Sequence, residues 1–353
     1  MIKQLALTLI ALGLFTSCLK EQELKLPYEG FTPKTLHDGW AISTPADVNM
    51  DEGLLEQAFI HFYSAEKFPM GESLLVFRQG KLVAEAYAKD KGDQHRLNNI
   101  QSCTKSVTSM LAGVALQEGL ITSLNQSLYS FYPQVFTSDS KKASISLRNC
   151  LSMQAGLDFD NGIHTEELFH TPGNSLQYIL SRPMVYDTGA IFHYNDGLPH
   201  LAGAAIATAA GKSLEQFTQE KLFNPLGIQE YKWEKAKDGT NFGAFSLHLK
   251  PRDLAKLGQL CLQNGKWEGQ QLISASYLEE AVKVQAGSNT PYGYYFWLLP
   301  AFKGYAMKGH GGQFVFVCPE KELLIVYTAF PYTDRSLWTD EGALIEPIFR
   351  ACK

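Results

Sequence analysis

The 353-residue chain contains few cysteines, and their spacing matches no common site. Six cysteines are spread along the sequence, and no two of them are separated by only two residues. This pattern favours neither a disulfide framework nor a cysteine-rich zinc site. The His-Glu-x-x-His pattern of zinc hydrolases is also missing. We therefore expect no metal and no cofactor.

The sequence has no excess of positive charge. It carries 31 Lys and Arg against 36 Asp and Glu, for a formal net charge of −5, and has no long basic run. A nucleic-acid partner is therefore not expected. No internal repeat and no low-complexity tract is present. With 45% hydrophobic and 19% charged residues, the composition is that of an ordinary globular protein.

Long apolar runs are missing after the first 18 residues, so no later segment is expected to span a membrane. Residues 1–17 combine Lys3, an apolar run over 5–15 and two small residues, the pattern of a signal peptide. Cys18 follows directly and resembles the lipidated cysteine of a bacterial lipobox. Residues 18–35 then form a polar tether. We expect a lipoprotein anchored in the bacterial cell envelope, facing the periplasm or the exterior, with plain secretion as the alternative.

Hydrophobic patterns place strands near both ends of the chain and helices in the middle. The predicted strands are 73–79, 81–87, 294–299, 306–308, 314–318 and 323–329, and the predicted helices include 102–117, 253–262, 275–284 and 341–350. This order indicates an α+β domain over 36–353. Its sheet part covers about 36–119 and 287–353, and its mostly helical insertion about 120–286.

The predicted helix at 102–117 opens with Ser102 and Lys105. Residues i and i+3 share one face of a helix, so the two side chains can lie within hydrogen-bond reach. A serine hydroxyl needs a neighbouring base to act as a nucleophile, and a lysine can serve when its surroundings lower its pKa. Ser-x-x-Lys alone recurs by chance. Here it opens an apolar helix and is followed by two further segments, Tyr194-Asn195-Asp196 and His310-Gly311-Gly312-Gln313.

These segments, with 151–157 and 251–258, resemble the serine β-lactamase-related hydrolases of the class C and penicillin-binding-protein kind. The resemblance extends from about residue 40 to residue 349. It implies a β-lactamase/transpeptidase-like fold with an antiparallel sheet, and an acyl-enzyme mechanism. Ser102 would be the nucleophile, Lys105 and Tyr194 the proton-transferring groups, and His310-Gly311-Gly312 the counterpart of the Lys-Thr-Gly strand motif. The backbone N–H groups of Ser102 and Gln313 would form the oxyanion hole.

Two positions depart from the family pattern. Asp196 stands where the tyrosine element usually has an asparagine that contacts substrate, and an ionised carboxylate cannot donate as an amide does. His310 stands where β-lactamases have a lysine. A histidine ordinarily has a pKa of about 6.5 and is mostly neutral at pH 7.5. Lys308 shares a strand face with His310 and is the other candidate for the missing charge.

The sequence thus predicts a serine hydrolase that cleaves an ester or amide bond of a small or peptide-like substrate. The alternatives are a non-catalytic ligand-binding lipoprotein of the same fold, and a true β-lactamase or D-Ala-D-Ala carboxypeptidase. An α/β-hydrolase is disfavoured because no Gly-x-Ser-x-Gly occurs. The natural substrate and the principal base, Lys105 or Tyr194, are left open.

Overall fold

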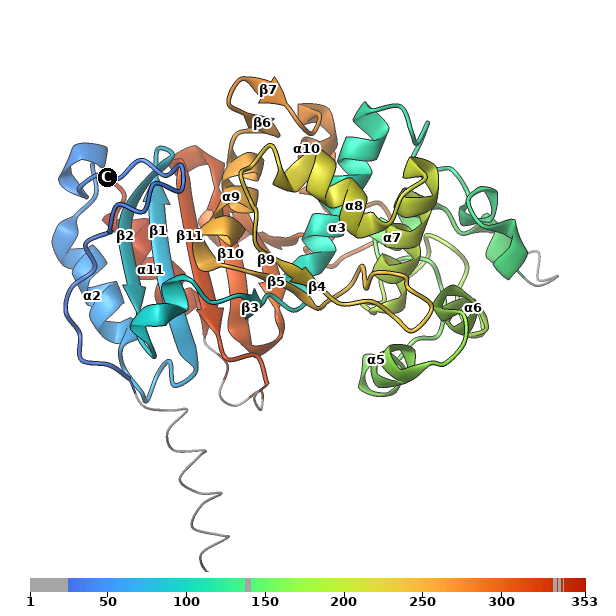
Figure 1. Ribbon diagram of the computed structural model, residues 1–353, viewed down its shortest axis with the longest axis horizontal. Coiled ribbons are helices and arrows are strands. Elements are labelled where there is room, and N and C mark those ends of the chain that lie inside the picture. Colours follow the sequence, from blue (N-terminus) through green and yellow to red (C-terminus); the bar gives the residue numbers. More distant parts are fainter. Residues whose placement is uncertain (1–24, 137–140, 333–334, 336–337, 339) are drawn as a thin grey trace, which may run out of the picture.

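The computed structural model describes residues 25–136, 141–332, 335, 338 and 340–353 (Figure 1). The signal peptide and residues 18–24 of the predicted tether, Cys18 among them, lie outside the described residues. The helices are α2 (Glu52–Phe62), α3 (Cys103–Gln117), α4 (Leu147–Leu151), α5 (Asn161–His170), α6 (Ser175–Leu180), α7 (Gly197–Ala210), α8 (Leu214–Thr218), α9 (Pro251–Leu262), α10 (Ala275–Ala281) and α11 (Glu341–Ala351).

Eleven strands are present in the described part of the chain. They are β1 (Gly71–Arg78), β2 (Lys81–Tyr87), β3 (Asn98–Asn99), β4 (Lys232–Trp233), β5 (Leu247–Leu249), β6 (Lys266–Trp267), β7 (Gln270–Gln271), β8 (Trp297–Leu299), β9 (Gly304–Gly309), β10 (Gln313–Cys318) and β11 (Leu323–Ala329).

A six-stranded antiparallel sheet has the order β2-β1-β11-β10-β9-β8. Its first two strands form the predicted hairpin, which turns at Gln79 and Gly80, both with positive φ. Such a turn matches the twist of paired strands. Because β1 from the N-terminal part pairs with β11 from the C-terminal part, one sheet is built from both ends of the chain. The α+β fold class is confirmed.

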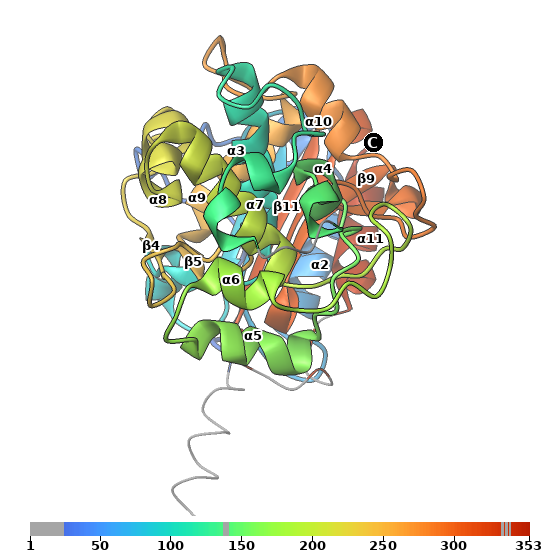
Figure 2. The same cartoon turned by 90° about the vertical axis from the view of Figure 1, so that its right-hand side faces the viewer.

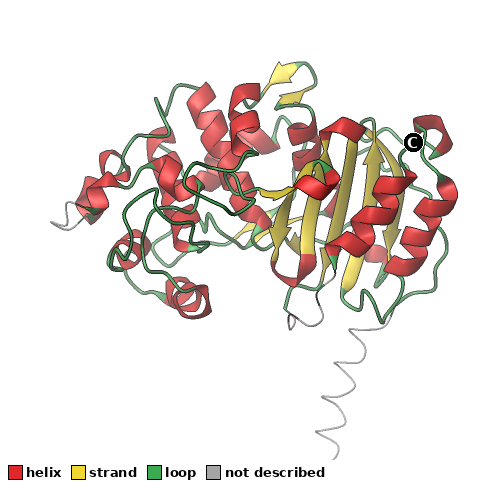
Figure 3. Ribbon diagram, turned by 180° about the vertical axis from the view of Figure 1, so that it is seen from behind, coloured by secondary structure: helices red, strands yellow, loops and turns green. Residues whose placement is uncertain are grey.

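Helices cover both faces of this sheet (Figures 1 and 3). One apolar cluster packs Leu74 and Val76 with α2 and α11, and another packs Leu75 and Phe77 with α3 and α9. This alternation is the two-residue period of a strand. On the second face α9 approaches closely through Gly258, where an added Cβ would lie 2.4 Å from Leu324 and 2.6 Å from Val315. A side chain at this position would push the helix off the sheet.

The helical part lies to one side of the sheet and surrounds α3, which runs between the two (Figures 1 and 2). Every residue of α3 from Cys103 to Ala115 is buried. Two of its polar side chains donate to backbone carbonyls: the Thr108 hydroxyl to Gly243 at 2.7 Å, and the Ser106 hydroxyl to Tyr295 at 2.6 Å. Buried polar groups require such partners. The helix that carries the Ser-x-x-Lys motif is therefore fixed along its length.

Element boundaries differ from the prediction in three places. The predicted strand 294–299 is paired only over β8, because Tyr295 has a left-handed backbone (φ 64°) and its N–H bonds back to Gly293 in a turn. The predicted helix 275–284 ends at Ala281. Helix α2 was missed, and so were the three-stranded sheet β3-β5-β4 and the two-stranded sheet β6-β7, whose strands of two or three residues leave no periodic signal.

Two further properties concern the described residues alone. Their five cysteines are free and buried, as the sequence indicates for small core residues. Within the same residues, none of the helices has the length and apolar character needed to cross a bilayer.

Candidate active site

Ser102 lies at the start of α3, in a backbone bend held from several sides. Gln101, just before it, has a left-handed conformation (φ 51°), which is uncommon for a residue other than glycine. The Thr104 hydroxyl donates to the Gln101 carbonyl at 2.7 Å, and the Ile100 N–H donates to Leu247 at 2.9 Å. The bend places the half-buried Ser102 directly before the N-terminus of α3. Its N–H belongs to the first turn, where helices leave such groups without a helical partner.

Lys105 is the central group of the site. Its side chain is only 1% exposed, and its Nζ contacts three oxygen atoms. These are the Ser102 hydroxyl at 2.7 Å, the Ala244 carbonyl at 3.1 Å and Oδ1 of Asp196 at 2.6 Å. The predicted i, i+3 contact between Ser102 and Lys105 is therefore present. The contacts with Ser102 and Ala244 are hydrogen bonds, and the contact with Asp196 is an ion pair.

The pKa of Lys105 reflects two opposing effects. Burial lowers it, because a charged group loses its hydration in the protein interior. The nearby Asp196 carboxylate and Tyr194 raise it, and together they outweigh burial, so the pKa lies above its ordinary value. Lys105 is thus held as a cation.

Tyr194 lies across the site from Ser102, and its half-buried ring faces Lys105. The Lys105 Nζ is 4.9 Å from the ring centroid, a cation–π arrangement. Behind it stand Tyr292 and Trp297, with ring centroids 6.0 and 5.6 Å from that of Tyr194. The structure therefore brings Tyr194 together with Ser102 and Lys105, as predicted. The aromatic side chains behind it fix the orientation of its ring.

Asp196 lies deeper than a direct substrate contact requires. Only 8% of the residue is exposed, and both carboxylate oxygens have protein partners. Oδ1 contacts Lys105 and Oδ2 accepts a hydrogen bond from the Thr165 hydroxyl at 2.8 Å. The predicted substrate-binding role of Asp196 stays a prediction. In the structure its carboxylate is the counter-ion of Lys105.

The His310-Gly311-Gly312 segment follows β9 and turns the chain into β10. His310 is exposed and its ring packs edge-on against Trp338, with 4.5 Å between centroids. Gly311 has a φ of 79°, and an added Cβ would lie 2.6 Å from Pro331. Only glycine fits this turn. His310 accordingly lies at the surface end of β9, where the sequence predicts the cleft edge.

Gln313 is fully buried. Its amide side chain donates to the Ala329 carbonyl and accepts from the Ala329 N–H at 3.1 Å, so it ties β10 to β11. Gly309, its partner across β9 and β10, packs against the segment before α3: an added Cβ would be 2.5 Å from the Ile100 carbonyl and 3.0 Å from Gln101 Cβ. The Gln313 carbonyl lies 3.8 Å from Cys103 Sγ, and the oxyanion role of the Gln313 N–H stays a prediction.

Lys308 provides no free charge at the rim. Its Nζ forms an ion pair with Glu341 at 2.5 Å, and it lies 5.8 Å from the ring centroid of Trp297. Trp297 in turn contacts Tyr194, so the pair borders the aromatic wall of the site. Glu341 was not anticipated, because the first residue of α11 and the strand end at Lys308 are 33 positions apart in the sequence.

Thr165 and Asn161 were also missed. The Thr165 hydroxyl bonds Oδ2 of Asp196, and the Asn161 side chain accepts from the Asp196 N–H at 2.9 Å. Both belong to α5, which is mostly exposed and gives no hydrophobic signal that would link it to the site. Only the tertiary fold brings α5 to this position.

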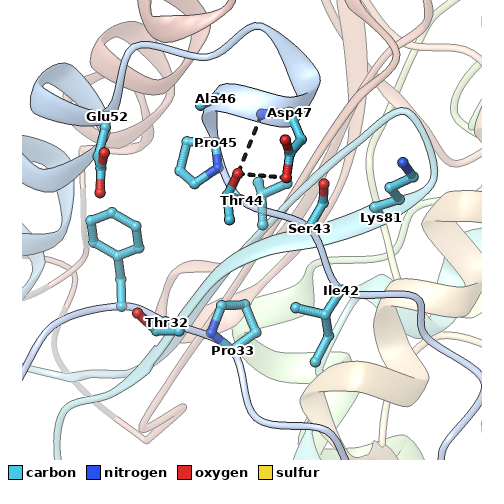
Figure 4. A pocket seen from close by; sticks show the side chains of 12 residues that line it. Thr32, Pro33, Ile42, Ser43, Thr44, Pro45, Ala46, Asp47, Glu52 and Lys81 are labelled. Carbon is cyan, nitrogen blue, oxygen red and sulfur yellow. Dashed lines mark hydrogen bonds between the residues drawn. The ribbon is translucent and has the colours of Figure 1, made fainter.

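A pocket of about 750 Å³ lies at the β2 edge, between residues 31–33 and 42–47 (Figure 4). None of the residues of the site described above lines it. Among the residues that the structure describes, no three His, Cys, Asp or Glu side chains are grouped so as to hold a metal ion.

Comparison with known families agrees with this geometry. The family model described as Beta-lactamase matches residues 66–336, more than half of the chain. The chain belongs to the beta-lactamase family. Members of this family are serine hydrolases and include esterases, amidases and penicillin-binding-protein-like proteins. No curated protein matches the chain.

Solved structures of the beta-lactamase fold superpose on most of the chain. A Bacillus anthracis protein assigned provisionally as a 6-aminohexanoate-dimer hydrolase has a TM-score of 0.70 and 17% identity, covering 94% of this chain and 91% of its own. A family VIII carboxylesterase gives 0.66 and 19%, covering 88% and 98%. A penicillin-binding-protein homologue from Caulobacter crescentus gives 0.66 and 16%, covering 89% and 99%. At these identities the likeness shows the fold alone.

The position of Tyr194 leads to a prediction. Tyr194→Phe removes a hydroxyl beside Lys105 while keeping the ring between Tyr292 and Trp297. We expect kcat on a reporter ester to fall by roughly 10²–10⁴-fold, the usual contribution of a positioned proton-transfer group. The matched control is Tyr129→Phe, on a ring that is 49% exposed and far from Ser102 in sequence. An unchanged rate in folded Tyr194→Phe protein would show that Tyr194 has a packing role and takes no part in proton transfer.

Proposed function

We propose that this beta-lactamase-family protein is a serine hydrolase that forms an acyl-enzyme on Ser102 and hydrolyses an ester or amide of a small or peptide-like substrate. The observation that carries the proposal is the 2.7 Å contact between the Ser102 hydroxyl and the buried Nζ of Lys105. A structural serine at a helix start does not need a buried cation at its oxygen. Burying a charged side chain is unfavourable unless a partner or a function retains it. Lys105 has Asp196 as a partner, and the proposed function is to act on the Ser102 hydroxyl.

In the proposed reaction, Ser102 Oγ attacks the substrate carbonyl carbon and loses its proton to a neighbouring group of the site. The carbonyl π electrons move to oxygen, and the backbone N–H groups of Ser102 and Gln313 stabilise the resulting oxyanion. The bond to the leaving alcohol or amine then breaks, and the leaving group takes up the proton. Water repeats the sequence on the acyl-enzyme and frees Ser102.

The first test is covalent labelling of Ser102. A fluorophosphonate should add one label per molecule to the wild-type protein, measured by intact mass, and none to Ser102→Ala. The control is Ser276→Ala, an exposed serine on α10 that should label like the wild type. Labelling of Ser102→Ala would place the nucleophile elsewhere. No labelling of the folded wild type would instead support a non-catalytic ligand-binding protein.

We further propose that neutral substrates are preferred over those that carry a carboxylate next to the scissile bond. Three observations support this preference. His310 replaces the lysine of the strand motif, Lys308 is neutralised by Glu341, and Asp196 adds a negative charge to the site. A substrate carboxylate would thus meet no uncompensated cation among these residues. A true β-lactamase or D-Ala-D-Ala carboxypeptidase needs such a cation.

Matched substrates test the preference. Penicillin acylation of the wild type at pH 7.5 should be slow relative to that of a neutral ester. His310→Lys should raise kcat/KM for penicillin by up to about fivefold, because one exposed charge contact contributes about 0.2–1 kcal/mol, and should leave the neutral ester unchanged. Glu341→Gln should act in the same direction by freeing Lys308. Fast penicillin acylation by the wild type, lost only in Lys308→Ala, would contradict the argument from His310.

We also propose that the mature protein is a lipoprotein of the bacterial cell envelope. The support is the order of charge, apolar run, small residues and Cys18 in the first 18 residues. Wild-type protein should fractionate with membranes and carry added mass on Cys18. Cys18→Ser should release it into the soluble fraction. A wild-type protein that is soluble and cleaved elsewhere would leave secretion as the alternative.

A further inference from the structure

The carboxylate of Asp196 is held from behind by α5. The Asp196 N–H donates to Asn161 at 2.9 Å, and Oδ2 accepts from Thr165 at 2.8 Å. These two contacts leave Oδ1 facing Lys105 at 2.6 Å. The carboxylate cannot turn away from Lys105 without breaking the bond to Thr165. Its orientation is therefore set by a helix that does not itself contact Ser102.

This arrangement fixes the charge of Lys105. If Lys105 lost a proton, Asp196 would remain as a buried anion without a counter-ion, which is strongly unfavourable. An asparagine at the same place would impose no such cost. The difference between a carboxylate and an amide at position 196 therefore decides how firmly Lys105 holds its third proton.

The other titratable groups around Lys105 do not compete for this role. Cys103 precedes it on the same helix, and burial raises the pKa of that thiol well above its ordinary value. Behind Tyr194, burial likewise raises the pKa values of Tyr292 and Tyr295 far above the ordinary range. All three are neutral at physiological pH. Asp196 is the anion in contact with Lys105, and Tyr194 is the neighbour able to become one.

We propose that Asp196, oriented by Asn161 and Thr165 of α5, is a positioning residue that keeps Lys105 protonated, so that Lys105 holds the Ser102 hydroxyl as an ammonium ion. The proposal builds on the proposed function for the role of Ser102, but the charge state of Lys105 can be measured without any reaction.

The assignment has a consequence for the first step of acylation. An ammonium ion cannot accept the Ser102 proton, so the proton goes to Tyr194, which must itself have lost a proton beforehand. As Ser102 Oγ bonds to the carbonyl carbon, its O–H bond breaks, the phenolate oxygen of Tyr194 takes the proton, and Lys105 stays charged throughout.

The decisive experiment measures the titration of Lys105 directly. Protein containing lysine labelled with ¹³C at Cε is titrated by NMR, and the Lys105 signal is assigned as the one missing in Lys105→Met. In the wild type it should stay in the protonated position beyond pH 10.5, the ordinary value of a lysine. In Asp196→Asn it should titrate about one to three pH units lower, the usual effect of losing an adjacent opposite charge.

The chain offers a matched control. Lys256 and Asp253 form another largely buried ion pair, 2.9 Å apart on α9. Asp253→Asn should leave the Lys105 titration unchanged. Should Asp196→Asn fail to fold, Thr165→Val frees the carboxylate from α5 and should lower the Lys105 titration by a smaller amount, while Thr165→Ser should restore it.

Two results would overturn the proposal: an identical Lys105 titration in the wild type and in folded Asp196→Asn, or a wild-type Lys105 that already loses its proton near neutral pH. Failure of Ser102 to react with a fluorophosphonate would count against the hydrolase function alone. If the Lys105 titration shifts as expected but the protein does not react with a fluorophosphonate, the proposal on the charge of Lys105 stands and the hydrolase function is rejected.

Discussion

The site is organised around one buried ammonium ion. Lys105 brings Ser102, the carbonyl of Ala244 and the carboxylate of Asp196 to a single point, although these residues belong to three separate parts of the chain. A buried cation without partners is among the costliest features a protein can contain. The surrounding elements must therefore keep their places: the backbone at 243–247 against α3, the loop before α7, and α5 behind that loop. The same cation connects the packing of these elements to the position of the Ser102 hydroxyl.

The sequence predicted much of this, for physical reasons. Residues three apart on a helix share a face, so the Ser102 and Lys105 contact follows from local geometry once the helix is recognised. The strands β1, β2, β10 and β11 have strong two-residue alternation or continuous apolar runs, and their positions at the two ends of the chain indicate one sheet. The closing helix α11 was predicted from its amphipathic pattern. In each case the information lies within a short stretch of sequence.

What the sequence did not predict depends on contacts between distant segments. The ion pair between Asp196 and Lys105 was not predicted, because the motif does not show how the loop before α7 lies against α3. Thr165 and Asn161 lie on an exposed helix, and Glu341 lies at the far end of the chain from Lys105. Tyr295 was expected in a strand, and its left-handed backbone instead delivers its carbonyl to Ser106. Such pairings arise only when the chain has folded.

The two departures from the family motifs act in the same electrostatic direction. Replacing an amide by Asp196 adds one negative charge beside Lys105, and replacing a lysine by His310 removes a positive one at the rim. Glu341 cancels the charge of Lys308, the cation nearest to that rim position in the strand. Each change on its own would shift recognition of an anionic substrate modestly, since partly exposed charges contribute little. Together they leave Lys105 paired with Asp196 and Lys308 paired with Glu341. These pairings are the basis of the proposed preference for a neutral carbonyl compound, which would develop negative charge only in the transition state.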